Sequence, residues 1–392
     1  MSSRSPLMVA ASEALVWDDR FRRYDFGPGH PFTEESRWLA VKLAEASGLF
    51  DGTEGGGPVI RISHVEPASR ADLLRFHEED YLALVERVSG LRHGGSLDAG
   101  DTPSFPGCFD SAARIVGGSL AALRAVETEQ ARRSFHPAGG LHHAHPDRAS
   151  GFCIFNDLAI AIRTWLASGG RGRRVAYLDI DAHHGDGVMY GFFEDGRVLD
   201  VDFHQDGRTL FPGTGFPSEI GRGDGAGLKI NVPLPPAAGD EAFLPLFDRI
   251  VPRFVREFRP DLIVLQHGVD AHGGDRLAQL QLTDRAYQHA LASAIALSHE
   301  LCGDRLLVSG GGGYSAQNVA LVLARAALML AGRTVPDSAA LPAVFRKTFE
   351  ETTAYPAPHN WSDKISPPPS AWSKSRETDL LTELSRSLGT KV

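Results

Sequence analysis

The residues with the clearest chemistry lie in the segment YLDIDAHHGDG, which follows an apolar run of strand length. It places three acids and two histidines within eight positions. On a strand, Asp179 and Asp181 point to the same side, and two carboxylates at a buried strand end are costly unless a cation joins them. Asp181 and His183 repeat this spacing. The cluster therefore predicts a metal site rather than a helix cap followed by solvated histidines.

A third metal ligand is expected from another strand end. Asp270 follows the apolar run 261–266 at a short distance. Two aspartates and one histidine leave a tetrahedral cation with an open position for water, which is typical of a catalytic zinc site. Such an ion lowers the pKa of bound water to about 7 and polarises a carbonyl group. The same donor set suits ferrous iron, so the residues leave the choice of ion open.

Hydrolysis also needs a general base, and the turn PAGGLHHAHP supplies adjacent histidines. The imidazoles of His142 and His143 titrate near neutral pH and can pass a proton from water to a leaving amine. Each would need an acid to orient it. Asp179 and Asp186 remain available for this after metal ligation, whereas we interpret His145 as a surface histidine.

A donor for a developing oxyanion follows the apolar run 305–309. Four glycines, Gly310 to Gly313, precede Tyr314. A glycine run lets the backbone approach closely and aim one side chain. The phenol of Tyr314 can then donate a hydrogen bond to a tetrahedral intermediate. The run lacks the Lys-Ser/Thr ending of a phosphate-binding loop, so we reject nucleotide binding.

The elements that must position these residues alternate along the chain. Apolar runs of strand length cover 174–180, 197–203, 261–266 and 305–309, and segments with helical spacing cover 110–128, 156–168, 241–258, 284–300 and 317–331. Strands that alternate with helices predict a parallel sheet covered on both faces. In such sheets ligands bind outside the carboxyl ends of the strands, which is where the polar residues cluster.

Composition limits the class of protein. The chain has 392 residues, of which 23% are charged, and a formal net charge of -9. We predict a single domain over 1–392, with a core at about 15–335 and a peripheral C-terminal extension at 336–392. There is no basic patch that would indicate nucleic-acid binding. The sequence has no stretch of about 20 apolar residues, which is the length that would indicate a membrane span.

Cysteine usage and the N-terminal segment bear on location. Cys108, Cys153 and Cys302 are far apart and odd in number, so no disulfide framework is expected and a reducing cytoplasm is favoured. Residues 1–17 contain no sustained apolar run followed by a cleavage site, so we expect no signal peptide.

Taken together, the motifs resemble those of the histone deacetylase superfamily, and most of all the bacterial acetoin-utilisation deacetylases. The resemblance runs from YDFGPGHP at 24–31 to about residue 332 and includes PAGGLHHA, SGFCIFND, YLDIDAHHGDG, FPGTG, GVDAHGGD and GGGGY. The order and joint presence of these motifs are highly specific. The resemblance implies an arginase-like, single-domain α/β fold with a central eight-stranded parallel sheet flanked by helices.

The resemblance also implies a role for each catalytic group. One zinc ion per chain would be held by Asp181, His183 and Asp270. His143 would be the main acid/base, paired with Asp186, and His142 its electrostatic partner, paired with Asp179. Tyr314 matches the catalytic tyrosine of active members. A structural potassium ion is expected beside the zinc, mostly on backbone carbonyls around 179–183 and near Asp202.

The same resemblance suggests residues that bind substrate. Phe152 and Phe211 would grip the four-carbon stem of an acyl-lysine. Gly151 could offer its carbonyl to the substrate amide, and Asp101 matches a rim acid that holds backbone amides of the substrate. An arginine that helps acetate leave is expected after the His-Pro motif. Arg37 lies one residue later than that pattern, with Glu35 nearer the usual place, so we leave the role open.

These residues predict zinc-dependent hydrolysis of N-acetyl-lysine in proteins, and the subfamily suggests an acetylated enzyme such as an acyl-CoA synthetase as partner. An acetylpolyamine deacetylase would use the same chemistry behind a different entrance. A binuclear manganese enzyme of the arginase type needs a further ligand where Gly185 stands. A non-catalytic acyl-lysine binding protein disagrees with Tyr314 and the tandem histidines. The sequence leaves acyl-chain preference and oligomeric state open, and His267 and His272 without a role.

Overall fold

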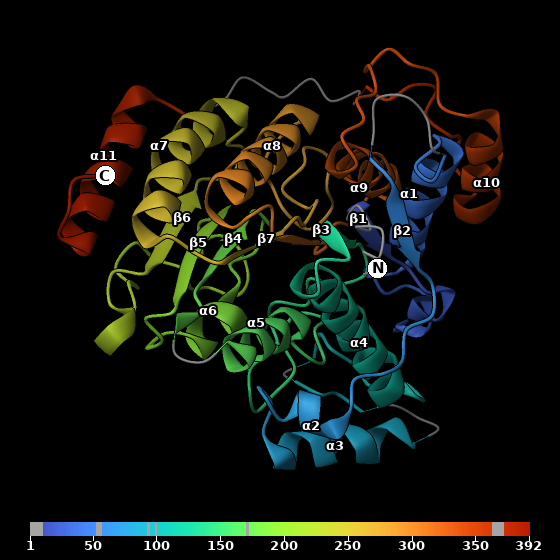
Figure 1. Ribbon diagram of the computed structural model, residues 1–392, viewed down its shortest axis with the longest axis horizontal. Helices are drawn as coiled ribbons and strands as arrows, with labels where there is room; N and C mark the ends of the chain where they lie inside the picture. Colours follow the sequence, from blue (N-terminus) through green and yellow to red (C-terminus); the bar gives the residue numbers. More distant parts are fainter. Residues whose placement is uncertain (1–10, 52–56, 92–94, 99, 170–171, 363–371) are drawn as a thin grey trace, which may run out of the picture.

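The computed structural model describes residues 11–51, 57–91, 95–98, 100–169, 172–362 and 372–392. Within them, eight parallel strands form one sheet in the order β2-β1-β3-β8-β7-β4-β5-β6 (Figure 1). The strands are β1 (Ala11–Val16), β2 (Val59–Ile62), β3 (Ala131–His136), β4 (Val175–Asp179), β5 (Val198–Gln205), β6 (Lys229–Leu234), β7 (Leu262–Gln266) and β8 (Leu306–Ser309). This sheet confirms the architecture that the resemblance implies.

Periodicity alone located four of the strands, β4, β5, β7 and β8. The missed strands carry charged residues: β1 contains the fully buried Glu13, β3 contains Arg132 and Arg133, and β6 begins with the buried Lys229. None of these segments is a plain apolar run. Only the family resemblance predicted the full number of strands.

The strand order brings distant parts of the chain together. β4 lies between β5 and β7, and Asp179 at its carboxyl end is in register with Asp202 of β5 and Gln266 of β7. Within the sheet, the strands β1 to β3 are joined to the strands β4 to β6 through β8 and β7, which come last in the sequence. Residues at these strand ends therefore meet at one edge of the sheet, as expected for parallel strands.

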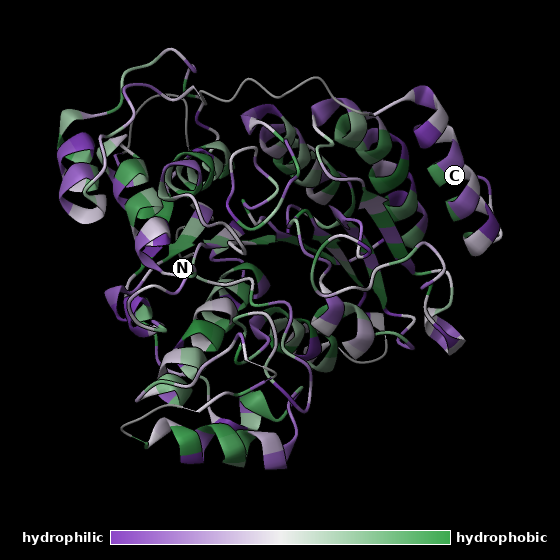
Figure 2. Ribbon diagram, turned by 180° about the vertical axis from the view of Figure 1, so that it is seen from behind, coloured by the Kyte–Doolittle hydropathy of each residue, from purple (hydrophilic) through white to green (hydrophobic). Residues whose placement is uncertain are grey.

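Helices cover both faces of the sheet (Figure 1). One face carries α1 (Glu35–Ala46), α7 (Asp240–Phe258), α8 (Asp284–Leu301) and α9 (Ala316–Leu330), and the other carries α4 (Cys108–Glu127), α5 (Asp157–Ser168) and α6 (Asp186–Gly191). The five helices predicted from helical spacing are confirmed as α4, α5, α7, α8 and α9. Figure 2 shows that the strands between the two layers are largely hydrophobic.

Smaller elements lie outside these layers. They are the 3-10 helix η1 (Asp19–Arg23), α2 (Arg70–Leu73), α3 (Glu79–Ser89), α10 (Ala343–Thr353) and α11 (Lys374–Leu388). α10 packs on α1, and α11 lies beside α7, where Arg249 donates to the carbonyl of Val392 at 2.8 Å. The division into a core and a peripheral extension stays a prediction, and the segment 363–371 of that extension lies outside the described residues.

Three other expectations meet the structure in part. Cys108, Cys153 and Cys302 are all free and buried, as expected. None of the helices in the described part of the chain has the combination of length and hydropathy that crossing a bilayer requires. The expectation about a signal peptide falls mainly on residues 1–10, which lie outside the described residues.

Helix α4 approaches the sheet closely through glycine. A Cβ atom on Gly118 would collide with the ring of His136 at the end of β3. His136 is fully buried, and burial lowers its pKa to about 4, so the ring is neutral at physiological pH. Glycine is therefore required at position 118 by close packing, although its intrinsic helix propensity is low.

Replacing Gly118 by alanine is expected to destabilise the fold by about 1–3 kcal/mol, because overpacking a close contact outweighs the better helix propensity of alanine. The free energy of unfolding in urea measures this. Gly90 is the matched control, since its φ is negative and a Cβ there would meet only one backbone oxygen, at 3.7 Å. An equal loss in Gly90→Ala would contradict the packing argument.

Candidate active site

Three buried side chains meet at the carboxyl ends of β4 and β7. Asp181 and His183 lie in the turn after β4, and Asp270 lies in the loop after β7. Nδ1 of His183 is 3.2 Å from Oδ1 of Asp181 and 2.9 Å from Oδ2 of Asp270. The three donor atoms lie within 4.8 Å of one another. The structure thus brings together the three metal ligands predicted from separate parts of the sequence.

The electrostatics of this group favour a cation. Burial and then the charge of Asp181 raise the pKa of Asp270 to about 7. Burial opposes a charge on His183, but the carboxylates of Asp270 and Asp181 outweigh it and raise the pKa of His183 to about 10. Two carboxylates and an imidazole in this environment form a donor set that fits a divalent ion such as zinc or ferrous iron. Across the described residues, no second group of potential ligands converges in this way.

Neutral donors hold the two carboxylates in place. Nε2 of Gln266 and the backbone N–H of Gly312 each donate to Oδ2 of Asp181 at 2.7 Å. The N–H of Ala182 donates to Oδ1 of Asp270, also at 2.7 Å. Such contacts fix the orientation of metal ligands. Sequence reasoning missed Gln266, although a polar residue at the carboxyl end of a buried strand was a signal for it.

His142 and His143 form a chain of hydrogen bonds with two further carboxylates. Nδ1 of His142 is 2.8 Å from Oδ2 of Asp179, and Nδ1 of His143 is 2.7 Å from Oδ1 of Asp186. The Nε2 atoms of the two histidines are 3.0 Å apart. Each histidine therefore lies beside the acid expected to orient it, while the catalytic roles of these residues stay predictions.

The two histidines differ in charge. Burial opposes a charge on His142, but Asp179 and Asp181 outweigh it and raise the pKa of His142 to about 10. Burial and then the positive charge of His142 lower the pKa of His143 to about 4. The direction of these shifts favours a charged His142 beside a neutral His143, whose Nδ1–H donates to Asp186. Nε2 of His143 is then the nitrogen that can take up a proton.

Two contacts of these acids were not predicted. The hydroxyl of Tyr177 donates to Oδ2 of Asp179 at 2.5 Å. Its position two residues before Asp179, on the same side of the strand, was a signal for this contact. Nε2 of His145 lies 3.0 Å from Oδ2 of Asp186. The interpretation of His145 as a surface residue is therefore wrong, because the side chain is buried against an acid that it shares with His143.

Tyr314 lies next to the metal-ligand group. Its ring is edge-on to His183, with the ring centroids 6.5 Å apart, and the side chain is largely buried. The backbone N–H of Tyr314 donates to Asp275 at 2.8 Å. The N–H of Gly310 donates to the carbonyl of His136 at 3.0 Å and that of Gly312 donates to Asp181, so the glycine run is held along its length beside the ring of Tyr314.

Aromatic side chains surround the approach to these groups. The ring of Phe152 lies 6.0 Å from that of Tyr314, and the ring of Phe211 lies 5.1 Å from that of His143. Phe211 is 40% exposed, so it lies where the passage opens to solvent. Gly151 separates these rings: its φ is +53°, and a Cβ there would lie 2.5 Å from the His143 ring and 2.8 Å from that of Phe211. Only glycine fits this position.

Asp101 lies at the rim of this passage. The hydroxyl of Thr102 donates to Oδ1 of Asp101 at 3.2 Å and accepts the backbone N–H of Phe152 at 3.0 Å. Nε2 of His30 is 3.4 Å from the carbonyl oxygen of Asp101. Burial, followed by the neighbouring carboxyl of Asp98, raises the pKa of Asp101 to about 6. The rim acid therefore changes charge slightly below neutral pH.

If Asp101 holds substrate amides, as the resemblance implies, the KM for an acetyl-lysine peptide should rise as the pH falls through about 6, because a protonated carboxyl accepts hydrogen bonds less well. Because the pKa of Asp101 is raised to about 6, its carboxylate form predominates only above that pH. Asp101→Asn should raise KM and remove this dependence. Asp98→Asn should shift it to lower pH, since one source of the raised pKa is gone. An unchanged KM profile in both variants would rule out this role.

Arg37, whose role the sequence leaves open, contacts the glycine run beside the site. The Arg37 guanidinium donates to the carbonyl of Gly311 and, at 3.0 Å, to that of Thr33. Glu35, which stands nearer the expected place in the sequence, pairs instead with Arg22 at 2.6 Å, where both side chains are partly exposed. Arg37 is thus the residue of α1 that contacts the glycine run.

The other unassigned histidines lie beside a different ring. His267 and His272 are buried and pack against Tyr287, with ring centroids 5.4 and 5.9 Å apart. His142, His143 and Tyr314 instead border a small cavity of about 10 Å³, whose wall also includes Phe32, Leu141, Gly151 and Cys153. This cavity lies directly beside Asp181 and His183.

The fold and this site define a hydrolase of the deacetylase type. The chain belongs to the histone deacetylase family, because the family model described as histone deacetylase domain matches residues 30–330. It is 35% identical over 344 residues to a probable deacetylase of Archaeoglobus fulgidus, covering 85% of this chain and 91% of that protein. It is 33% identical over 355 residues to the acetoin utilization protein AcuC of Bacillus subtilis, covering 89% of each chain.

A eukaryotic relative is similar over a shorter stretch. Histone deacetylase B of Dictyostelium discoideum is 36% identical over 310 residues, which cover 78% of this chain and 70% of that protein. These findings confirm the resemblance stated from the motifs. By family, the protein is a deacetylase.

Proposed function

We propose that the protein hydrolyses the acetyl amide of N-acetyl-lysine in acetylated proteins, with one zinc ion per chain. The observation that supports this most is the position of His143: its Nδ1 lies 2.7 Å from Oδ1 of Asp186, and its ring centroid lies 5.9 Å from that of His183 in the buried group of metal donors. A proton acceptor beside an ion site is what amide hydrolysis requires.

In this mechanism Asp181, His183 and Asp270 would hold the zinc ion. When bound, the ion polarises the acetyl carbonyl and lowers the pKa of water. Nε2 of His143 takes a proton from the attacking water. It then returns the proton to the lysine nitrogen as the C–N bond breaks, so that acetate and a lysine amine are released. Charged His142 would stabilise the negative charge that develops at the acetyl oxygen.

The entrance supports a lysine side chain as the substrate. Phe152 and Phe211 would pack against its four methylene groups, and the carbonyl of Gly151 would accept a hydrogen bond from the amide. Asp101 at the rim would hold backbone amides that a free polyamine lacks. The relative from D. discoideum is named for action on histones, which also supports a protein substrate.

The test compares an acetyl-lysine peptide with acetylspermidine at known metal content. We expect peptide turnover to exceed polyamine turnover at least tenfold in kcat/KM, because only the peptide offers backbone amides to Asp101. Asp101→Asn should reduce this preference. Turnover of acetylspermidine alone would move the function to an acetylpolyamine deacetylase with the same site chemistry. Turnover of neither substrate would support a binding protein.

The natural partner and the ions are part of the proposal. The names of the AcuC relatives refer to acetoin utilization, which supports an acetylated metabolic enzyme such as an acyl-CoA synthetase as substrate. Ferrous iron is the alternative to zinc. A potassium ion would lie on carbonyls near Asp179 and Asp202, two buried acids in register on adjacent strands. A cytoplasmic location fits three buried free cysteines.

A further inference from the structure

An arginine-lined groove lies between η1 and the beginning of α4. Its volume is about 700 Å³, and its wall includes Arg20, Arg22, Arg23, Arg114, Phe26 and Phe105. None of these residues takes part in the chemistry described above. The groove is therefore separate from the cavity beside the metal-ligand group.

Two of the arginines have acidic partners and two do not. Arg20 pairs with Asp18 and Arg22 pairs with Glu35, each at 2.6 Å. Arg23 is exposed and makes no ion pair with any side chain that the structure describes. Arg114 is half-buried and donates only to a backbone carbonyl. The groove thus has guanidinium groups with charge left to offer.

The positive charges in the groove affect one another. Burial and then the charge of Arg20 hold the pKa of Arg114 below its usual value, and Arg23 adds to this effect. Asp18 and Glu66 act in the opposite direction and offset part of this repulsion. The beginning of α4, a helix of 20 residues, adds partial positive charge, since its N-cap residue Gly107 provides no side-chain acceptor.

The acids of the groove are fewer than its arginines. They are Asp25 and Asp110. Asp25 accepts the backbone N–H of Gly27 at 2.9 Å, and Asp110 lies in the first turn of α4, where it offsets part of the helix dipole. Since Arg20 and Arg22 already pair with Asp18 and Glu35, these two aspartates share the wall with two guanidinium groups that make no ion pair among the described residues, those of Arg23 and Arg114.

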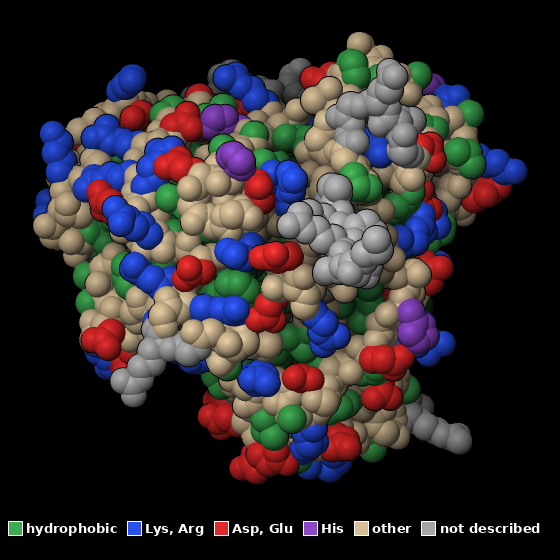
Figure 3. Space-filling model, in the orientation of Figure 1, with side chains coloured by type: hydrophobic (Ala, Val, Ile, Leu, Met, Phe, Trp, Pro, Cys, Tyr) green, Lys and Arg blue, Asp and Glu red, His purple; other side chains and the backbone are tan. Residues whose placement is uncertain are grey.

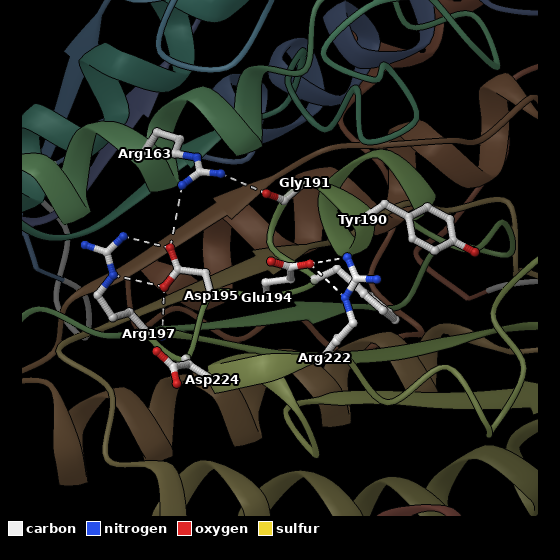
Figure 4. A pocket seen from close by; sticks show the side chains of 10 residues that line it. Arg163, Tyr190, Gly191, Glu194, Asp195, Arg197, Arg222 and Asp224 are labelled. Carbon is white, nitrogen blue, oxygen red and sulfur yellow. Dashed lines mark hydrogen bonds and ion pairs between the residues drawn. The ribbon is translucent and has the colours of Figure 1, made fainter.

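A second arginine-lined hollow shows the opposite arrangement (Figure 4). There Arg163 and Arg197 both meet Asp195, at 3.6 and 2.7 Å, and Arg222 meets Glu194. Each guanidinium in that hollow already has a carboxylate. The guanidinium groups of Arg23 and Arg114 differ from those of this hollow, because neither pairs with a carboxylate in the part of the chain that the structure describes.

The groove begins beside the entrance to the active site. Phe26 forms part of its wall, and the ring of Phe26 also lies 6.4 Å from that of Phe152 and 4.4 Å from that of His30 at the rim. Phe105 packs on the other side of Phe26 at 5.5 Å. A polypeptide whose acyl-lysine enters past Phe152 would therefore pass the groove with its neighbouring residues.

We propose that this groove binds an anionic side chain of the substrate, so that the enzyme prefers acyl-lysines with a carboxylate or a phosphate a few residues away. Arg23 and Arg114 would supply charge-assisted hydrogen bonds to that group. This inference rests on the proposed function, because it concerns the polypeptide that carries the acyl-lysine.

The test uses acetyl-lysine peptides in which one glutamate is moved through successive positions on either side of the lysine. Each is compared with the same peptide carrying glutamine, and a second series carries phosphoserine. For wild type we expect kcat/KM to be roughly 3- to 10-fold higher with the anion at its best position, mainly through KM. Arg23→Gln and the double variant with Arg114→Gln should reduce this preference toward unity.

The matched control is Arg124→Gln, an exposed arginine near the far end of α4. It should keep the full preference for the anionic peptide. Inorganic phosphate should compete with the anionic peptide and leave the glutamine peptide unaffected. Equal kcat/KM for all peptides in wild type, or inhibition of both peptides alike by phosphate, would overturn the proposal. Failure to turn over a short acetyl-lysine amide would instead refute the proposed function.

Discussion

Tyr314→Phe is expected to lower kcat for an acetyl-lysine peptide by about 10²- to 10³-fold while changing KM little, which is the effect of removing one donor to an oxyanion. The ring of Tyr314 is held edge-on to His183, so phenylalanine should fill the same space. Steady-state kinetics with metal-loaded protein measure the effect. Metal content and thermal midpoint should stay close to those of wild type.

Tyr287→Phe is the matched control for Tyr314. Its hydroxyl is buried and has no hydrogen-bond partner in the described structure, and its ring packs against His267 and His272. We expect this variant to keep activity within about twofold. If Tyr314→Phe retained wild-type kcat, the proposed oxyanion donor would be wrong, and another group would have to supply that hydrogen bond.

Removing the metal ion is expected to have the other large effect. A chelator should reduce deacetylation to background, and one equivalent of zinc or ferrous iron per chain should restore it. The thermal midpoint should rise on metal addition, because ligand binding stabilises the native state by about 4 kcal/mol at 1,000 times Kd. His183→Ala should show neither the restored activity nor the rise in thermal midpoint, since it removes the predicted metal ligand that contacts both Asp181 and Asp270.

Elemental analysis and a histidine outside the site complete this test. His289 pairs with Asp248 on α7 and is partly exposed, so His289→Ala should bind metal and turn over substrate as wild type does. Two ions per chain would revive the binuclear alternative. Full activity after complete metal removal would contradict the mechanism outright.

Parts of this site were open to prediction because the signal is local. Asp179, Asp181, His183 and Asp186 lie within eight residues at a strand end, so their types and spacing alone indicated metal and proton chemistry. The strand and helix alternation around them was also readable. The strands with buried charged residues could not be predicted, because a lysine or glutamate such as Lys229 or Glu13 argues against burial of its segment until its partner is known.

Other features depend on contacts between distant segments. Gln266 holds Asp181 across 85 residues, and Arg37 reaches Gly311 across 274 residues. Neither contact follows from periodicity. The raised pKa of Asp101 likewise depends on how the rim loop folds back on Asp98. The groove beside the entrance was not predicted either, because η1 and α4 are about 90 residues apart in the chain.

The order of the strands also governs how the protein can be made. The distribution of Lys, Arg, Asp and Glu over most of one face (Figure 3) helps to keep the finished molecule dispersed. During synthesis, however, the edges of β3 and β4 stay unpaired until β7 and β8 emerge, the latter ending at Ser309, 173 residues after His136. At ordinary translation rates this gap lasts about 10 to 30 s.

Once β6 has been made, the strands β1 to β3 and the strands β4 to β6 each lack the partner that joins them, and their unpaired inner edges are templates for pairing with other chains. Asp181 and His183, which follow β4, are made well before Asp270, so a complete set of metal ligands exists only after β7 has been made. A ribosome stalled before residue 262 would therefore carry a chain that neither binds its ion nor protects its strands. We expect chaperone demand to be highest while the ribosome translates this middle part of the message.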